Sequence, residues 1–317
     1  MAVPSSKIST RQKLIIDSDP GVDDSMALFL ALESDEWDII GITTIFGNAS
    51  IENSTRNALL LLEKAGRTDV PVARGHEGPL KGGKGEGGDY VMDGGHLHKE
   101  PTQKVIDKTA TQFLVDKINE FPGEVSILAL GPLTNVALAI KQDPSFASKV
   151  KQIVVLGGSY FELGNVNPAA EYNIYADALA ADIVFTSGAK VTVIGINITN
   201  YVSFSAEDFK KVTESGGKHA KVLGEIYGSS YLVSTDGIFL HDTLAYLVFA
   251  RPDLFSFKTG VVRVETRGIF EGLTLLDHGV KKWTTKNHWT EHDPINVVWT
   301  IKGDEALNYI RQELMKP

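Results

Sequence analysis

The sequence contains no cysteine, and this absence removes several classes of protein from consideration. Without a thiol the chain has no cysteine nucleophile, no thiolate zinc site and no disulfide framework. It is also short of positive charge, with 31 Lys and Arg against 40 Asp and Glu and a net charge of −9. That balance argues against nucleic acid as a partner and against docking on an anionic membrane surface.

Long apolar runs are missing as well. No stretch approaches the roughly 18 consecutive apolar residues of a membrane-spanning helix, and residues 1–13 contain no apolar core of a secretory signal. Together with the missing cysteines, this pattern predicts a cytoplasmic protein. What the sequence does contain is 317 residues, 43% of them hydrophobic, which is enough to bury a large core.

Short apolar runs alternate with helical patterns through the first two thirds of the chain. Strands are predicted at residues 13–17, 37–46, 70–73, 124–130, 152–156 and 190–196. Helices are predicted at residues 23–33, 50–65, 109–120, 133–141 and 177–186. This alternation predicts an α/β fold with an open, mostly parallel, Rossmann-like sheet flanked by helices.

The pattern changes from about residue 203, after which helical patterns dominate to residue 250. Two strand-like stretches and a last helix follow, at residues 260–266, 296–301 and 304–314. Because no linker or internal repeat separates these parts, we predict one domain over residues 13–317 after a tail of residues 1–12. Its C-terminal half is predicted to contain a helical insertion.

Residues 75–105 are rich in glycine and have few apolar anchors, which predicts a long loop near the functional site. The run Gly82 to Gly88 inside this stretch is not interpreted as a phosphate-binding loop. It follows no predicted strand directly, and it lacks the Gly-Lys-Ser/Thr ending of such loops.

Four aspartates lie within eight residues after the first predicted strand: Asp17, Asp19, Asp23 and Asp24. Open α/β sheets build their sites at such strand ends. Two unit charges about 4 Å apart repel by roughly 4 kcal/mol at a protein-like dielectric, whereas a helix N-terminus offsets only about 0.3–1 kcal/mol per charge. The sequence therefore predicts a bound cation, and all-oxygen ligands select Ca²⁺ or Mg²⁺. An acidic turn that only caps the next helix explains two of these acids but not four.

Polar groups follow three further predicted strands. Asn48 follows the second strand, Asn135 follows the strand at 124–130, and Asn165, Glu171 and Asn173 come after the strand at 152–156. Glu171 and Asn173 are two residues apart, so in an extended segment they point the same way. A single asparagine is typical of a turn. As a group beside an acid, these amides predict a polyol site, because sugar hydroxyls both donate and accept hydrogen bonds.

Two His-Asp pairs occur in the C-terminal half. His241 and Asp242 stand at the start of an apolar helical pattern, where an aspartate by itself is typical of a helix cap. His292 and Asp293 form a similar pair before a predicted strand.

These blocks together resemble the inosine-uridine nucleoside hydrolase family. The string Asp17-Ser-Asp-Pro-Gly-Val-Asp-Asp24, the segments 43–48, 130–135 and 157–173, and the pair His241-Asp242 come in that family's order and spacing. The resemblance spans about residues 13 to 315 and implies a parallel-rich sheet with Ca²⁺ at its strand ends. It further implies hydrolysis of the N-glycosidic bond of ribonucleosides such as uridine or inosine through an oxocarbenium-like transition state. It also implies a homodimer or homotetramer active in nucleoside salvage.

The resemblance also implies roles for individual residues. The expected metal ligands are Asp19, Asp24, Asp242 and the backbone carbonyl of Leu130. The residues expected to bind ribose are Asp23, Asn48, Asn165, Glu171 and Asn173. Asp19 is also expected to take a proton from the attacking water, and Asp17 to be a supporting acid. His241 is the expected proton donor to the leaving base, with His98 and Tyr231 as further candidates near that base.

Two departures from the family pattern leave the preferred base open. After its histidines the stretch Gly94 to Thr102 lacks the family's glycines, and Thr243 stands where many relatives have proline. A haloacid-dehalogenase-like phosphatase with Mg²⁺ is the rival enzyme, but Gly21 stands where those enzymes carry Thr or Val. A non-catalytic, Ca²⁺-stabilised nucleoside-binding protein would use the same polar residues.

Overall fold

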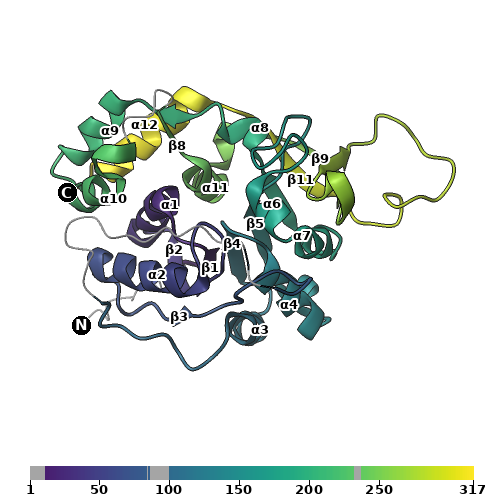
Figure 1. Ribbon diagram of the computed structural model, residues 1–317, viewed down its shortest axis with the longest axis horizontal. Helices are drawn as coiled ribbons and strands as arrows, with labels where there is room; N and C mark the ends of the chain where they lie inside the picture. The colour runs from purple at the N-terminus through teal and green to yellow at the C-terminus, as the bar shows by residue number, and fades with distance from the viewer. Residues whose placement is uncertain (1–10, 84, 86–99, 232–236) are drawn as a thin grey trace, which may run out of the picture.

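The computed structural model describes residues 11–83, 85, 100–231 and 237–317, with the side chains of 228–231 left aside. Nine of its described strands form one sheet in the order β10-β9-β11-β6-β5-β4-β1-β2-β3 (Figure 1), and two short strands form a separate pair. The strands that run parallel are β1 (Gln12–Ser18), β2 (Trp37–Thr44), β3 (Val72–Ala73), β4 (Val125–Ala129), β5 (Gln152–Leu156), β6 (Val191–Ile194) and β11 (Ile295–Ile301). Strands β9 (Phe255–Val264) and β10 (Thr274–Asp277) are antiparallel at one edge. The predicted open, mostly parallel sheet is confirmed.

Helices cover both faces of the sheet, which explains why its inner strands read as continuous apolar runs. One core cluster joins the sheet to α1 (Val22–Glu33), α2 (Ile51–Ala65), α11 (His241–Ala250) and α12 (Gly303–Leu314). The other cluster joins it to α3 (Ala110–Glu120), α4 (Thr134–Gln142), α5 (Phe146–Lys149) and α7 (Ala178–Phe185). Every residue of β4 is buried, as expected of a strand between two helical layers.

Helices dominate the segment after residue 203, as predicted. The short helix α8 (Ile196–Thr199) leads into α9 (Ala206–Thr213), α10 (Ala220–Tyr231) and α11. In Figure 1, α9, α10 and α12 lie together at the upper left, beyond α1. The sequence did not predict the two-residue strands β7 (Ser203–Phe204) and β8 (Ile238–Phe239), nor the edge strand β10, because strands this short carry little periodicity.

The described parts of the predicted loop at 75–105 contain neither helix nor strand, in agreement with the prediction. Residues 84 and 86–99 lie outside the described residues. In the part of the chain that the structure describes, no helix combines the length and apolarity needed to span a membrane.

The register of three neighbouring strands brings the predicted site segments together. Asp17 in β1 lies opposite Thr43 in β2 and Ala129 in β4. The residues that follow these strands therefore meet at the carboxyl ends of the strands, and Leu130 comes directly after β4. This juxtaposition is the topological basis of the site.

Replacement of Gly41 by alanine is expected to lower the free energy of unfolding by about 1–3 kcal/mol, the usual cost of overpacking a core. An ideal Cβ at Gly41 in β2 would lie 2.3 Å from the Cζ atom of Phe113, a buried side chain that has no room to swing away. Urea unfolding measures the effect. Gly303→Ala is the control, because its new Cβ would meet a Val202 methyl carbon at an ordinary 3.7 Å. Equal unfolding midpoints for the two variants would contradict this account.

Candidate functional site

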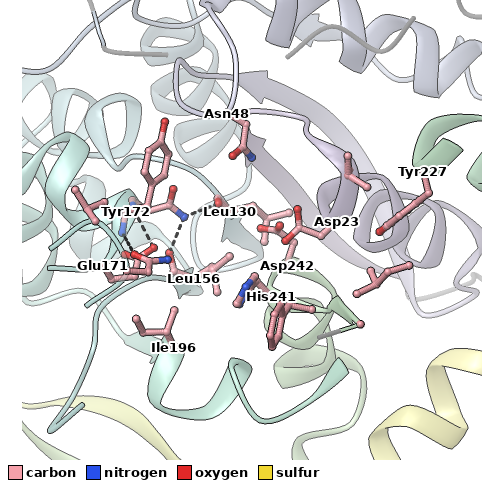
Figure 2. Close-up of a pocket in the computed structure, with 17 residues that line it drawn as sticks. Asp23, Asn48, Leu130, Leu156, Glu171, Tyr172, Ile196, Tyr227, His241 and Asp242 are labelled. Atoms are coloured by element: carbon pink, nitrogen blue, oxygen red, sulfur yellow. Dashed lines mark hydrogen bonds between the residues drawn. The ribbon is translucent and has the colours of Figure 1, made fainter. Parts of the chain in front are cut away.

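A cavity of about 660 Å³ lies at the carboxyl ends of β1, β4 and β5 (Figure 2). Helices α1, α6 (Tyr172–Ala176), α8, α10 and α11, the strand β8 and the loops after β2 and β5 contribute the rest of its wall. The predicted residues that line it are Asp23, Asn48, Leu130, Asn165, Glu171, Asn173, His241 and Asp242. Segments up to 220 residues apart in the sequence thus meet around one cavity large enough for a nucleoside.

Three carboxylates gather at one end of this cavity. One oxygen each from Asp23, Asp24 and Asp242 lie within 4.8 Å of one another. Asp23 and Asp242 line the cavity, whereas Asp24 and Asp19 are fully buried behind its wall. Asp19 belongs to the same electrostatic group, because its charge raises the pKa of Asp242.

Burial and mutual repulsion disfavour the charged forms of these acids. Burial and then the charge of Asp24 raise the pKa of Asp19 well above its ordinary value. Burial and then the charge of Asp23 raise the pKa of Asp24 to about 7. The pKa of Asp242 is likewise raised by burial and by Asp23 and Asp24. A cation in this group would reverse these shifts.

Two carboxylate oxygens indicate whether the cluster can bind a metal ion. Oδ1 of Asp19 and Oδ1 of Asp242 are buried and have no hydrogen-bond partner among the described residues. A buried acceptor left without a partner costs about 1–3 kcal/mol, and more when it is charged. Oxygen ligands of this kind suit a hard divalent cation. The acidic cluster can therefore bind a metal ion, as the sequence predicted.

The loop after β1 is held rigidly by its own hydrogen bonds. The Ser18 hydroxyl donates to Asp24 Oδ1 at 2.6 Å, and the Gly21 amide donates to Asp24 Oδ2 at 2.9 Å. The backbone amide of Asn48 donates to Asp19 Oδ2 at 2.6 Å. Gly47 permits this approach, because a Cβ there would lie 1.9 Å from Asp19 Oδ2. The acids are thus fixed in position by donors from two neighbouring strand ends.

Asp17 lies one layer deeper and links β1 to β2 and to the start of α4. Its Oδ1 accepts hydrogen bonds from the Thr43 hydroxyl at 2.5 Å and from Asn135 Nδ2 at 2.8 Å. Asn135 Nδ2 also donates to the carbonyl of Thr44. Burial raises the pKa of Asp17 to about 6 despite these two hydrogen bonds. This position fits the supporting role expected for Asp17.

The prediction that Glu171 and Asn173 lie in an extended segment is wrong. Glu171 is the N-cap of α6, and its carboxylate accepts from the amides of Gly158, Asn173 and Ile174. Asn173 is in the first turn of α6, and its Nδ2 donates to the carbonyls of Leu130 and Leu156. Both side chains still line the cavity, because Glu171 precedes the helix with an extended backbone and its carboxylate caps the turn that contains Asn173.

His241 and Asp242 begin α11, as predicted, and both line the cavity. His241 Nδ1 lies 2.6 Å from the Thr199 hydroxyl, and the His241 ring stacks on Phe239 with centroids 5.6 Å apart. Burial lowers the pKa of His241, and the charge of Asp23 offsets part of that effect. The imidazole is therefore fixed in orientation and favoured in its neutral form.

Sequence reasoning missed several residues of this wall. Ile196, Tyr227 and Phe239 line the cavity outside the recognised motifs, and Tyr172 lies in the segment 157–173 but was not singled out. Tyr227 is one helical turn before Tyr231, so the i, i+4 relation was the available signal. The side chain of Tyr231 and the whole of His98 lie outside the described residues. The pair His292-Asp293 does not line the cavity in the part of the chain described.

Comparisons with known proteins find close relatives. Residues 14–308 match the family model for inosine-uridine preferring nucleoside hydrolase. Probable uridine nucleosidase 1 of Oryza sativa subsp. japonica is 54% identical over 97% of this chain and 98% of its own length. Uridine nucleosidase 1 of Arabidopsis thaliana is 51% identical over 98% of this chain and 95% of its own length. A solved plant nucleoside hydrolase is 42% identical, with a TM-score of 0.89, over 96% of this chain and 99% of that one.

Asp242→Asn is expected to abolish stabilisation by an added divalent cation. The unchanged protein should gain about 2.7 kcal/mol at a hundredfold excess of the ion over its Kd. In chelator the variant should be the more stable of the two, because it buries one charge fewer. Calorimetric Tm values with Ca²⁺ and with chelator measure both effects.

Asp177→Asn is the matched control for this experiment. Asp177 is also buried, but its oxygens accept from Leu80, Thr134 and Ala180. Its loss should lower the Tm equally with and without the ion. An Asp242→Asn variant that still responds to Ca²⁺ as the unchanged protein does would refute the metal assignment.

Proposed function

The chain belongs to the inosine-uridine preferring nucleoside hydrolase family and is therefore a nucleoside N-ribohydrolase, and we propose that it hydrolyses uridine in a Ca²⁺-dependent reaction. The observation that carries the proposal is the group of carboxylates at one end of a cavity of about 660 Å³. Two of their oxygens, Asp19 Oδ1 and Asp242 Oδ1, have no hydrogen-bond partner among the described residues. Uridine is chosen because the most similar curated relatives given above are named as uridine nucleosidases.

The proposed Ca²⁺ ligands are Asp19, Asp24, Asp242 and the backbone carbonyl of Leu130. Several carboxylates and a carbonyl from different elements match the high coordination number of Ca²⁺, whereas Mg²⁺ usually keeps most of its waters. When bound, the ion lowers the pKa of a water molecule and offsets the negative charge of the cluster. Asp23 is partly exposed in the cavity wall, so we assign it to the ribose hydroxyls.

Asp19 is the proposed base. Its Oδ2 is held by the Asn48 amide, and its Oδ1 has no partner among the described residues. A carboxylate fixed at one oxygen presents the other in a defined direction, so Oδ1 can accept the proton of the attacking water. The same group of negative charges stabilises the positive charge that develops on the ribose as the C1′–N bond breaks.

Glu171, Asn173 and Asn165 are proposed to bind ribose from the opposite wall. Asn173 uses its Nδ2 on two backbone carbonyls, which leaves Oδ1 to accept from a sugar hydroxyl. Glu171 is held by three backbone amides and keeps lone pairs for a further donor. Neither side chain has to reorganise when the substrate binds, which keeps the cost of ordering low.

The base end of the cavity lies around His241, Tyr227 and Phe239. When the ring is protonated at both nitrogens, Nδ1 donates to the Thr199 hydroxyl oxygen, and Nε2 can transfer its proton to the departing base, which leaves the imidazole neutral. Among the described residues no Lys or Arg lines this cavity. A phosphate group would therefore find no Lys or Arg side chain to bind it, which argues against the phosphatase hypothesis.

Uridine is expected to be hydrolysed far better than 2′-deoxyuridine. The carboxylates and amides assigned to the sugar would be left unpaired by the deoxy compound, and such a site can reject it by as much as about 10⁴-fold. Release of reducing sugar from each nucleoside gives the two kcat/KM values. Asp23→Asn should bring the kcat/KM values of the two nucleosides closer together, because an amide oxygen accepts from the ribose hydroxyls more weakly than a carboxylate oxygen does. Equal kcat/KM for the two nucleosides would refute the ribose assignment.

His241→Ala is expected to slow uridine hydrolysis by about 10²–10⁴-fold, the usual worth of general acid catalysis. The loss should be much smaller for p-nitrophenyl riboside, whose leaving group needs no proton. Thr199→Val should show the same pattern more weakly, because it frees the ring without removing it. Comparing kcat for the two substrates decides the question. An equal drop for both would move the acid role away from His241.

A further inference from the structure

A second cavity, of about 300 Å³, adjoins the substrate cavity. The two cavities share two lining residues, Tyr172 and Val166. The remaining wall of the second cavity is largely apolar and includes Phe46, Tyr175 and Ala176. Tyr172 and Val166 therefore form a partition with the substrate on one side and this second space on the other.

The substrate atom that faces the partition follows from ribose geometry, and this step rests on the proposed function. In the ribose ring C4′, which carries C5′, lies opposite the C1′–C2′ bond. With the base toward His241 and the 2′-hydroxyl toward Asp23, C5′ faces the remaining wall. Figure 2 shows Glu171 and Tyr172 on that wall, across the pocket from Asp23 and Tyr227. The 5′ position thus points to the partition.

Tyr172 is fixed in the partition at both ends. Its backbone amide donates to Asn165 Oδ1 at 2.9 Å, and its hydroxyl donates to the carbonyl of Gly47 at 2.7 Å. Gly47 is itself packed against Asp19, where a Cβ would not fit. The aromatic ring therefore spans from α6 to the loop after β2 and closes the second cavity from the ribose side.

The chemistry of the second cavity selects neutral groups. Lys81 is the cation in its wall, and its ammonium group is paired with Glu271 and bonded to the carbonyl of Thr266. Asp177 adds a second acid to the same wall. A phosphate would meet two carboxylates and a cation that is already neutralised. A short alkyl ether or thioether would meet mostly aromatic and aliphatic carbon.

We propose that Tyr172 is the specificity-determining residue at the 5′ position. With its ring in place only a 5′-hydroxyl fits. With the ring removed, the second cavity accepts a neutral alkyl substituent on O5′, while water still cleaves the same C1′–N bond. The products are then the free base and the 5-O-alkyl ribose.

The test compares kcat/KM for uridine and for 5′-O-ethyluridine in several variants, loaded with Ca²⁺. Tyr172→Ala should raise the ratio of the 5′-O-ethyl value to the uridine value by about tenfold or more, the range that a few carbon atoms contribute to specificity. Tyr172→Phe is the control, because it keeps the ring and removes only the bond to Gly47. Its ratio should stay as in the unchanged protein.

Three further measurements keep the proposal falsifiable. Val166→Ala opens the same partition at a side chain that is 42% exposed, so its folding is not at risk, and it should raise the ratio in the same direction. Adding Ala176→Leu to Tyr172→Ala should refill the second cavity and cancel the gain. The kcat/KM for uridine 5′-monophosphate, relative to that for uridine, should not rise in any variant.

The outcomes separate the two levels of inference. Failure of the unchanged protein to hydrolyse uridine would overturn the proposed function. Normal uridine hydrolysis with an unchanged ratio in Tyr172→Ala and Val166→Ala would overturn the partition. An equal gain for the monophosphate, or an equal gain in Tyr172→Phe, would overturn the selection of neutral groups or the role of the ring, respectively.

Discussion

The structure depends on keeping several negative charges together where water cannot screen them. Asp19, Asp24 and Asp242 are buried, and Asp23 lies beside them in the cavity wall. Each close pair costs about 4 kcal/mol at a protein-like dielectric before any compensation. Backbone amides and hydroxyls around the loop after β1 supply part of that compensation and fix the geometry. A bound divalent cation would supply the remainder, because metal binding to such a cluster adds directly to the stability of the folded state.

This constraint explains which parts of the molecule were predictable. A parallel sheet buried on both faces must consist of apolar runs separated by helices, and the sequence shows that alternation from β1 to β6. The acids follow the first of these runs directly, so their position at the sheet edge needed no knowledge of distant contacts. Strands β7, β8 and β10 carry two to four residues each, and their pairing is set by tertiary contacts rather than by a local pattern.

The same distinction between local patterns and distant contacts applies to the candidate site. The string from Asp17 to Asp24 could be interpreted locally, whereas His241 and Asp242 were associated with it only through the family resemblance. The spacing of Glu171 and Asn173 was interpreted with the period of a strand. The Glu171 carboxylate instead caps α6, whose first turn contains Asn173, so the local period is that of a helix. Tyr172 and Thr199 were not singled out, because their partners lie 125 and 42 residues away in the sequence.

The two ends of the cavity are built from different kinds of contact, and this division has a functional consequence. The acidic end is a group of close carboxylates held by shared hydrogen bonds, so a substitution there disturbs several charges at once. The base end consists of Ile196, Tyr227, Phe239 and His241, which come from the helical segment after β6 and make mostly apolar contacts. Apolar contacts tolerate exchange of side chains of similar volume. Under the proposed function, exchange of side chains between α8 and α11 would therefore change the preferred base without altering the acidic cluster. The hydrogen bond between Thr199 and His241 joins α8 to α11 and would keep His241 in register with Asp242 when the rest of that wall varies.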